Sequence, residues 1–118
     1  MSAPKQIIVM RKDLNMRKGK MISQGAHASM AVILNMGTRI SDRFNIDPLP
    51  QATKEWLNGS FTKITVYVNS EQELLDVYAK AEAAGTPCAI IKDAGRTEFN
   101  GVPTLTCCAI GPDYPTVS

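Results

Sequence analysis

Two apolar runs near the end of the sequence are joined by a connection that carries no helical pattern. Residues 87–91 and 104–110 are short and apolar, as expected of strands, and Gly111-Pro112 is expected to stop the second. A parallel crossover between strands needs a dozen or more residues and usually contains a helix. We therefore predict that these two strands are antiparallel partners in one sheet.

Two further strands are predicted earlier in the chain. Residues 7–10, Ile-Ile-Val-Met, form a continuous run rich in β-branched side chains, which is typical of a buried, central strand. Residues 61–68 instead alternate, with Ile64 and Val66 on one side and Thr65 and Tyr67 on the other. The first of these strands is expected at the centre of the sheet.

A long helix is predicted between these two strands. Residues 19–35 place small and apolar side chains on one helical face, and Gly37 is expected to end the helix. The residues of that face are Met21, Gly25, Ala28 and Val32. Residues 39–50 are polar, contain two prolines and are expected to be irregular.

Two more helices are predicted further on. Residues 51–57 favour a short helix that Asn58-Gly59 closes. Ser70 and Glu73 have the spacing of a capping box, which predicts a helix from there to about residue 84, ended by Gly85. The side chains that this helix is expected to bury are Leu74, Leu75, Val77, Tyr78 and Ala81.

The order of these elements predicts a single α/β domain over residues 1–118. We expect a three-layer α/β/α sandwich on a small four-stranded mixed sheet. A chain of 118 residues with 44% hydrophobic and 20% charged residues is typical of a folded globular domain. The three cysteines lack a C-x-x-C pair, and adjacent Cys107 and Cys108 would point to opposite faces of a strand. These features favour reduced packing cysteines, and without a recognisable signal peptide or membrane span we expect a cytoplasmic protein with no membrane partner.

Positive charge gathers at the start of the chain, although the net charge is only +2. The basic residues there are Lys5, Arg11, Lys12, Arg17, Lys18 and Lys20, and Asp13 is the one acid among them. A solvated basic loop and a patch that attracts a polyanion are both compatible with this cluster.

Lys20, Gln24 and His27 share one face of the predicted first helix, because they lie at positions i, i+4 and i+7. One interpretation is a polar stripe that faces solvent, with His27 in a structural role. A cation in the first turn is disfavoured by the helix dipole, so Lys20 there favours a role toward a ligand. The backbone N–H groups of that turn also suit an anion.

The loop Asp93-Ala94-Gly95-Arg96-Thr97 follows a buried strand. Ligands of α/β folds gather outside the carboxyl ends of strands. If the first and third strands are parallel, Asp93 lies at the same edge as the start of the first helix, and Lys20 becomes its neighbour. The alternative is an ordinary turn in which Asp93 and Thr97 bond the local backbone.

Two motifs together resemble a known family. Residues 18–28, K-G-K-M-I-S-Q-G-A-H-A, resemble the G-K-G-K-x-x-x-Q-x-x-H-A signature of the type II (archaeal and eukaryotic type) peptidyl-tRNA hydrolases. Residues 91–97, I-K-D-A-G-R-T, resemble that family's D-A-G-x-T loop, and residues 107–112, C-C-A-I-G-P, its last strand. Arg17 stands where the family usually has glycine. The V-x-G-x-L-K-L-like segment that usually follows the G-P turn is missing from the sequence, so the domain is expected to lack it.

The resemblance implies an enzyme that hydrolyses the ester bond between a peptide and the 3′-terminal ribose of tRNA. Asp93 is expected to orient or deprotonate the attacking water. Lys20 would stabilise the oxyanion or hold a terminal phosphate, and Thr97 would position the water or Asp93. Gln24 would hydrogen-bond the substrate, and His27 is expected to support the site more than to act as its base.

The resemblance also implies partners. Arg11, Lys12, Arg17, Lys18 and Arg96 are expected to form a basic rim for the acceptor end of tRNA. We expect a homodimer, and neither a metal nor another cofactor, because one histidine and scattered acids make no zinc cluster. The alternative is a non-catalytic RNA- or small-ligand-binding module of the same fold. A protein with no ligand and a solvated polar stripe is the third possibility.

Overall fold

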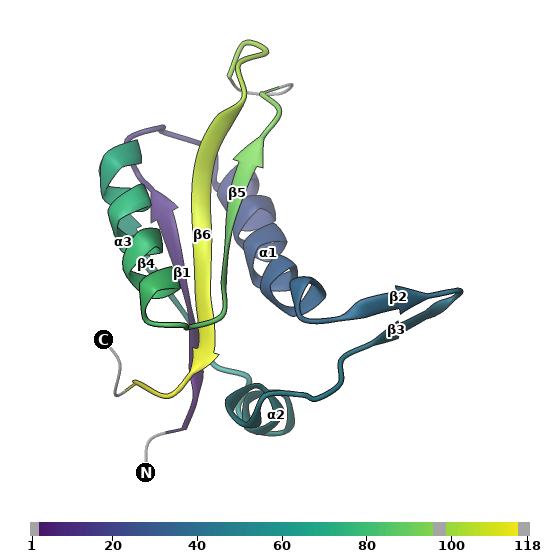
Figure 1. The fold of residues 1–118 in the computed structure, drawn as a ribbon. Coiled ribbons are helices and arrows are strands. Elements are labelled where there is room, and N and C mark those ends of the chain that lie inside the picture. Colours follow the sequence, from purple (N-terminus) through teal and green to yellow (C-terminus); the bar gives the residue numbers. More distant parts are fainter. Residues whose placement is uncertain (1–2, 96–98, 116–118) are drawn as a thin grey trace.

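The protein, described here over residues 3–95 and 99–115 by a computed structural model, is built around one mixed sheet (Figure 1). Its elements follow in the order β1 (Lys5–Arg11), α1 (Lys18–Asn35), β2 (Thr38–Ile40), β3 (Arg43–Asn45), α2 (Gln51–Asn58), β4 (Lys63–Val68), α3 (Glu71–Ala83), β5 (Cys88–Asp93) and β6 (Thr104–Asp113). The four-stranded sheet has the order β4-β1-β6-β5. Strands β1 and β4 are parallel, and β6 runs antiparallel to β1 and β5. The predicted α/β fold with an antiparallel final pair is confirmed.

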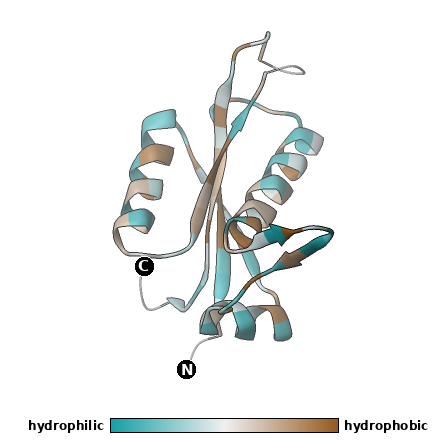
Figure 2. Cartoon of the chain, turned by 45° about the vertical axis from the view of Figure 1, so that its right-hand side comes forward, coloured by the Kyte–Doolittle hydropathy of each residue, from teal (hydrophilic) through white to brown (hydrophobic). Residues whose placement is uncertain are grey.

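Helices α1 and α3 cover opposite faces of the sheet, with apolar strand residues between them (Figures 1 and 2). On the α1 side the core includes Met10, Ala28, Val32, Cys107 and Ala109. On the α3 side Val9, Leu74 and Cys108 are buried together. Cys107 and Cys108 therefore belong to opposite cores, as their alternation along a strand predicts.

Helix α1 packs closely because its sheet-facing side is made of small residues. A Cβ atom built on Gly25 would lie 3.7 Å from Ile8 Cγ2 and Met10 Cε, which is ordinary van der Waals contact. Gly25, Ala28 and Val32 are buried as predicted, whereas Met21 is only partly buried. The buried face also contains polar Ser29, whose hydroxyl donates to Gln6 Oε1 at 2.5 Å.

Helix α3 begins with the predicted cap. The hydroxyl oxygen of Ser70 accepts a hydrogen bond from the Glu73 N–H group at 3.0 Å. The Glu73 carboxylate reaches back one residue further than a standard capping box, to the Asn69 N–H group at 2.7 Å. Gly85, with φ +73°, follows the helix end as expected of a C-terminal glycine.

One predicted irregular segment contains a hairpin. Strands β2 and β3 pair antiparallel and project from the body of the domain (Figure 1). Ile40 pairs with Arg43, so Ser41, at φ +57°, and Asp42 form the turn. The prediction of irregular structure for residues 39–50 is wrong in this part. Each strand has three exposed residues, so no buried face imposes an alternating pattern.

Three predicted strand limits also differ from the structure. Strand β4 begins at Lys63, because Phe61 has φ +57° and turns the chain. Strand β6 continues past Gly111-Pro112 to Asp113, which pairs with Lys5. Asp93, expected as the first loop residue, is the last residue of β5 and pairs with Thr104.

Candidate active site

The topology brings the two sequence motifs to one edge of the sheet. Strands β1 and β5 are each antiparallel to β6, so they are parallel to each other and end at the same edge. Helix α1 begins at this edge, after β1, and β5 ends there with Asp93. Lys20 Nζ consequently lies 2.9 Å from Asp93 Oδ1, an ion pair between the two motifs.

Every oxygen of the Asp93 carboxylate accepts a hydrogen bond. Oδ1 accepts from Lys20 and, at 3.4 Å, from Gln24 Nε2, and Oδ2 accepts from the Gly95 N–H group at 2.8 Å. The hydrogen bond from Lys20 is the main cause that lowers the pKa of Asp93 below its usual range, and burial opposes it. Asp93 is therefore held as a carboxylate in a fixed orientation.

Gln24 is part of a buried hydrogen-bond chain. The Thr106 hydroxyl donates to Gln24 Oε1 at 2.5 Å, and Thr106 is fully buried. The Cys107 thiol donates to the Gln24 carbonyl oxygen at 3.3 Å. Because Thr106 occupies the amide oxygen, the amide nitrogen of Gln24 is directed to Asp93. Gln24, which is expected to bind substrate, thus also donates a hydrogen bond to the carboxylate of Asp93.

Thr106 is a site residue that the sequence pattern missed. Ile91 pairs with Cys107 and Lys92 pairs with Leu105, so Thr106 is the extra residue of a bulge in β6. A bulge re-aims a side chain. Thr106 and Cys107 both reach α1, although strict alternation would send neighbouring side chains to opposite faces of the sheet.

Phe99 is a second residue that sequence reasoning missed. Lys20 Nζ lies over its ring, 6.0 Å from the ring centroid. The connection that carries Phe99 is held by the hydrogen bonds from Gly101 N–H to the Gly95 carbonyl, 2.8 Å, and from Val102 N–H to the Phe99 carbonyl, 2.9 Å. A Cβ atom on Gly95 would lie 2.3 Å from the Val102 carbonyl oxygen, so this position requires glycine.

Of the two remaining predicted catalytic residues, His27 lies within the described part of the chain and Thr97 does not. His27 is exposed on α1, one turn after Gln24, and is the weakest of the causes that lower the pKa of Asp93. In the part of the chain that the structure describes, His27 makes no hydrogen bond to Asp93. Thr97 and Arg96 lie outside the described residues.

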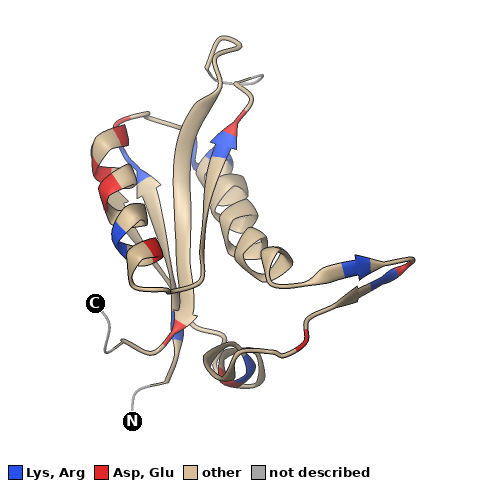
Figure 3. Ribbon diagram, in the orientation of Figure 1, with Lys and Arg blue, Asp and Glu red and all other residues tan. Residues whose placement is uncertain are grey.

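The predicted basic rim divides into two kinds of residue. Lys12, Arg17 and Lys18 are exposed near the end of β1 and the start of α1. Arg11 is buried, and its guanidinium donates to both oxygens of Asp13, at 2.6 and 3.1 Å, and to the Leu105 carbonyl at 3.0 Å. Strand β1 ends with Arg11, and the end of this strand is blue, the colour of basic residues, in Figure 3. The charge of Arg11 is thus engaged within the protein.

Among the described residues there is neither a metal-binding cluster nor a helix that could span a membrane. Over residues 3–95 and 99–115, no group of three or more His, Cys, Asp or Glu side chains is arranged to hold a metal ion. None of the helices described there has the length and apolar character needed to cross a membrane.

A lysine–aspartate pair at the carboxyl edge of an α/β sheet, beside exposed cations, is compatible with a hydrolytic site for a polyanionic substrate. Comparison with known proteins defines the class further: the chain belongs to the family described as Peptidyl-tRNA hydrolase PTH2, whose model matches residues 4–117.

Several curated relatives are similar over most of their length. A peptidyl-tRNA hydrolase of Methanocaldococcus jannaschii is 46% identical over 109 residues, which cover 92% of this chain and 86% of the relative. Those of Haloquadratum walsbyi and Metallosphaera sedula are 41% and 38% identical, over 92% of this chain and 86% of each relative. The family resemblance of the two motifs is thereby confirmed.

Proposed function

We propose that this protein hydrolyses the ester bond of peptidyl-tRNA, releasing free tRNA and peptide. The observation that carries the proposal is the 2.9 Å contact between Lys20 and Asp93, which joins the two motifs of the family at one sheet edge. Release of labelled N-acetyl-aminoacyl groups from tRNA by the purified protein tests it. Binding of tRNA without release would favour a non-catalytic module.

The proposed mechanism is attack by water without a covalent enzyme intermediate. Asp93 accepts a hydrogen bond from the water and aims its oxygen at the ester carbonyl carbon. Lys20 stabilises the negative charge that develops on the carbonyl oxygen. The bond from the carbonyl carbon to the ribose oxygen then breaks, and a proton from the water passes to that oxygen.

The lowered pKa of Asp93 supports one of its two predicted roles, the orientation of the water. A carboxylate that is a weak base removes a proton poorly, but it still orients a water molecule and balances charge. Asp93 is thus proposed to act mainly by orientation and electrostatics. Gln24 keeps the carboxylate of Asp93 in place. Thr97 is proposed to assist in positioning the water, and His27 is proposed to support the rim of the site.

The proposed tRNA surface is the exposed part of the basic rim. Lys12, Arg17 and Lys18 would contact phosphates of the acceptor end, and Arg96 would join them. For Arg11 we propose a supporting role, because its charge is paired with Asp13 and its side chain ties β1 to Leu105 of β6. We also propose that the protein works in the cytoplasm, where peptidyl-tRNA arises during translation.

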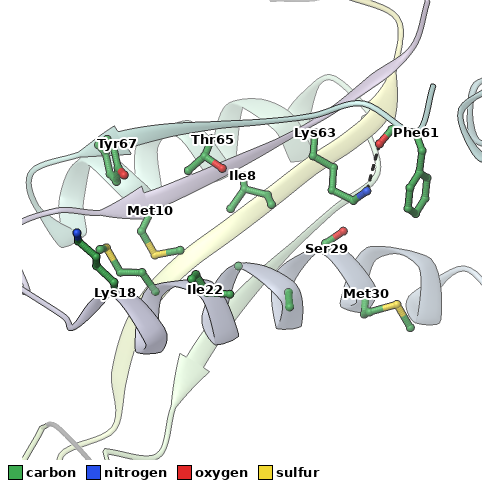
Figure 4. Close-up of a pocket in the computed structure, with 13 residues that line it drawn as sticks. Ile8, Met10, Lys18, Ile22, Ser29, Met30, Phe61, Lys63, Thr65 and Tyr67 are labelled. Carbon is green, nitrogen blue, oxygen red and sulfur yellow. Dashed lines mark hydrogen bonds between the residues drawn. The ribbon is translucent and has the colours of Figure 1, made fainter.

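We further propose that the protein is a homodimer joined through β4. This strand ends the sheet, and it exposes Ile64, Val66 and Tyr67 by 39%, 43% and 56%. A groove of about 740 Å³ lies beside it, between α1 and β4, with Ile8 and Met10 of β1 at its floor (Figure 4). Identical edges of two copies can pair antiparallel about a two-fold axis, which covers such a strand.

The dimer proposal is tested by the molar mass in solution. Light scattering after size exclusion is expected to give twice the chain mass for the wild type. Val66→Lys places a charge on the edge strand and is expected to give monomers, whereas Asp42→Lys in the β2–β3 turn is expected to stay dimeric. A monomeric wild type across the accessible concentration range would reject the proposal.

A further inference from the structure

Phe99 lies where an aromatic ring can take part in substrate binding. Its ring is beside the ammonium group of Lys20, the residue proposed to stabilise the oxyanion. It is half-buried, since it packs against the α1-side core that includes Met16 and Cys107 while part of it stays accessible. The hydrogen bonds from Gly101 N–H to the Gly95 carbonyl and from Val102 N–H to the Phe99 carbonyl help to hold it in that position.

The substrate of the proposed reaction carries a flat aromatic base close to its ester. The ester is formed by the 3′-terminal nucleoside of tRNA, and its base is one ribose ring away from the reacting oxygen. When the carbonyl oxygen contacts Lys20, the base must therefore find a surface close to Lys20. Proteins commonly hold unpaired bases by stacking them on aromatic side chains.

The large apolar groove beside α1 is not the surface on which we expect this base to bind. It is lined by residues of β1 and β4, including Tyr67, at the end of the sheet away from β5. Lys18 and Ile22 line it from α1, on the flank of the helix that Lys20 does not share. Lys20 instead pairs with Asp93 of β5, next to Phe99.

We propose that Phe99 stacks on the base of the 3′-terminal nucleoside and thereby sets the position of the ester over Lys20 and Asp93. This inference rests on the proposed function and assigns a specificity residue to it. Phe99 is a binding residue in this account. The chemical step is assigned to Lys20 and Asp93.

The test compares two substrates that differ only in the terminal base. One is N-acetyl-aminoacyl-tRNA, and the other is the same molecule with an abasic terminal ribose. For the wild type, removal of the base is expected to lower kcat/KM about tenfold, within the range measured for base–aromatic stacking. For Phe99→Leu, kcat/KM on the intact substrate should fall by a similar factor, mainly through KM, with little further loss on the abasic one.

Controls separate stacking from a structural role. Phe99→Trp keeps a ring and is expected to keep the preference for the intact substrate, and Phe44→Leu in the β2–β3 hairpin should change neither substrate. Equal losses on both substrates in Phe99→Leu, or a wild type that hydrolyses both equally well, would overturn the inference. A wild type that hydrolyses neither substrate would instead reject the proposed function.

Discussion

Lys20 and Asp93 are separated by 73 residues in the chain, and their charged atoms lie 2.9 Å apart. Their side chains are only 16% and 15% exposed, so the pair is sheltered and little screened by water. The contact exists because β1 and β5 end at the same edge of the sheet on either side of β6. The ion pair therefore depends on the parallel arrangement of β1 and β5, which enters the prediction from the sequence only as a condition.

The first prediction concerns the hydrogen-bond chain behind Asp93. Thr106→Val keeps the shape of the side chain but leaves the buried Gln24 Oε1 without its donor, which is expected to cost about 1–3 kcal/mol in the free energy of unfolding. We also expect kcat to fall about tenfold, because Gln24 no longer directs its amide nitrogen to Asp93. Denaturant unfolding and single-turnover kinetics measure the two effects.

Thr38→Val is the matched control for this prediction. Thr38 is exposed in β2, away from Asp93, so removal of its hydroxyl is expected to leave kcat unchanged. If Thr106→Val and Thr38→Val behave alike in kcat, the chain from Thr106 to Asp93 has no part in positioning the carboxylate.

The second prediction concerns pH. The pKa of Asp93 is lowered in the folded protein, chiefly by the hydrogen bond from Lys20. The stability that its charge contributes is therefore fully present above the ordinary carboxyl pKa and is lost as the pH falls through the lowered value. The acid limb of kcat/KM that belongs to Asp93 should likewise lie below the ordinary carboxyl range.

Lys20→Met tests the cause of this shift. It removes the main interaction that lowers the pKa of Asp93, so the acid limb of the residual activity is expected to move to higher pH. Profiles of kcat/KM against pH for the wild type, Lys20→Met and Lys54→Met, an exposed lysine of α2, measure it. An acid limb that stays in place in Lys20→Met would mean that another group causes it.

The third prediction separates the basic residues by their surroundings. Lys12→Ala and Lys18→Ala remove exposed cations, and each is expected to reduce the slope of log affinity for tRNA against log salt by about one. Arg11→Ala breaks internal hydrogen bonds to Asp13 and Leu105 and is expected to lower the free energy of unfolding by about 1–3 kcal/mol. Its effect on the salt slope should be small.

Titration of binding at several salt concentrations, together with denaturant unfolding, distinguishes these residues. A salt slope near zero for the wild type would exclude the basic rim. A stable Arg11→Ala protein whose slope falls as much as that of Lys18→Ala would show that Arg11 contacts tRNA.

Much of the fold follows from features that are local in the sequence. The apolar run of β1 requires burial on both faces, and the helix-free connection before β6 requires an antiparallel pair. They do not fix the direction of β1 relative to β5. The contact between Lys20 and Asp93 is therefore predictable only if these two strands are parallel, and the pairing of both strands with β6 shows that they are.

Other parts of the site depend on departures from regular structure. Thr106 reaches Gln24 only because a bulge adds one residue to β6, and alternation assigns it to the other face. In the sequence, Arg11 resembles its exposed neighbour Lys12. Only the folded structure shows that Arg11 is buried, that Asp13 pairs with its charge and that the Leu105 carbonyl accepts its hydrogen bond. The position of Phe99 depends on how the loop closes on Gly95.

The measurement that tests the central claim most directly is the release of labelled N-acetyl-aminoacyl groups from tRNA by the wild type, Asp93→Asn and Lys20→Met. Asp42→Asn and Lys54→Met serve as matched controls on exposed positions. We expect both site variants to lose at least about a hundredfold in kcat/KM, roughly 2.7 kcal/mol of transition-state stabilisation, while the controls keep wild-type activity. Folded site variants that hydrolyse the ester as fast as the controls would contradict the account.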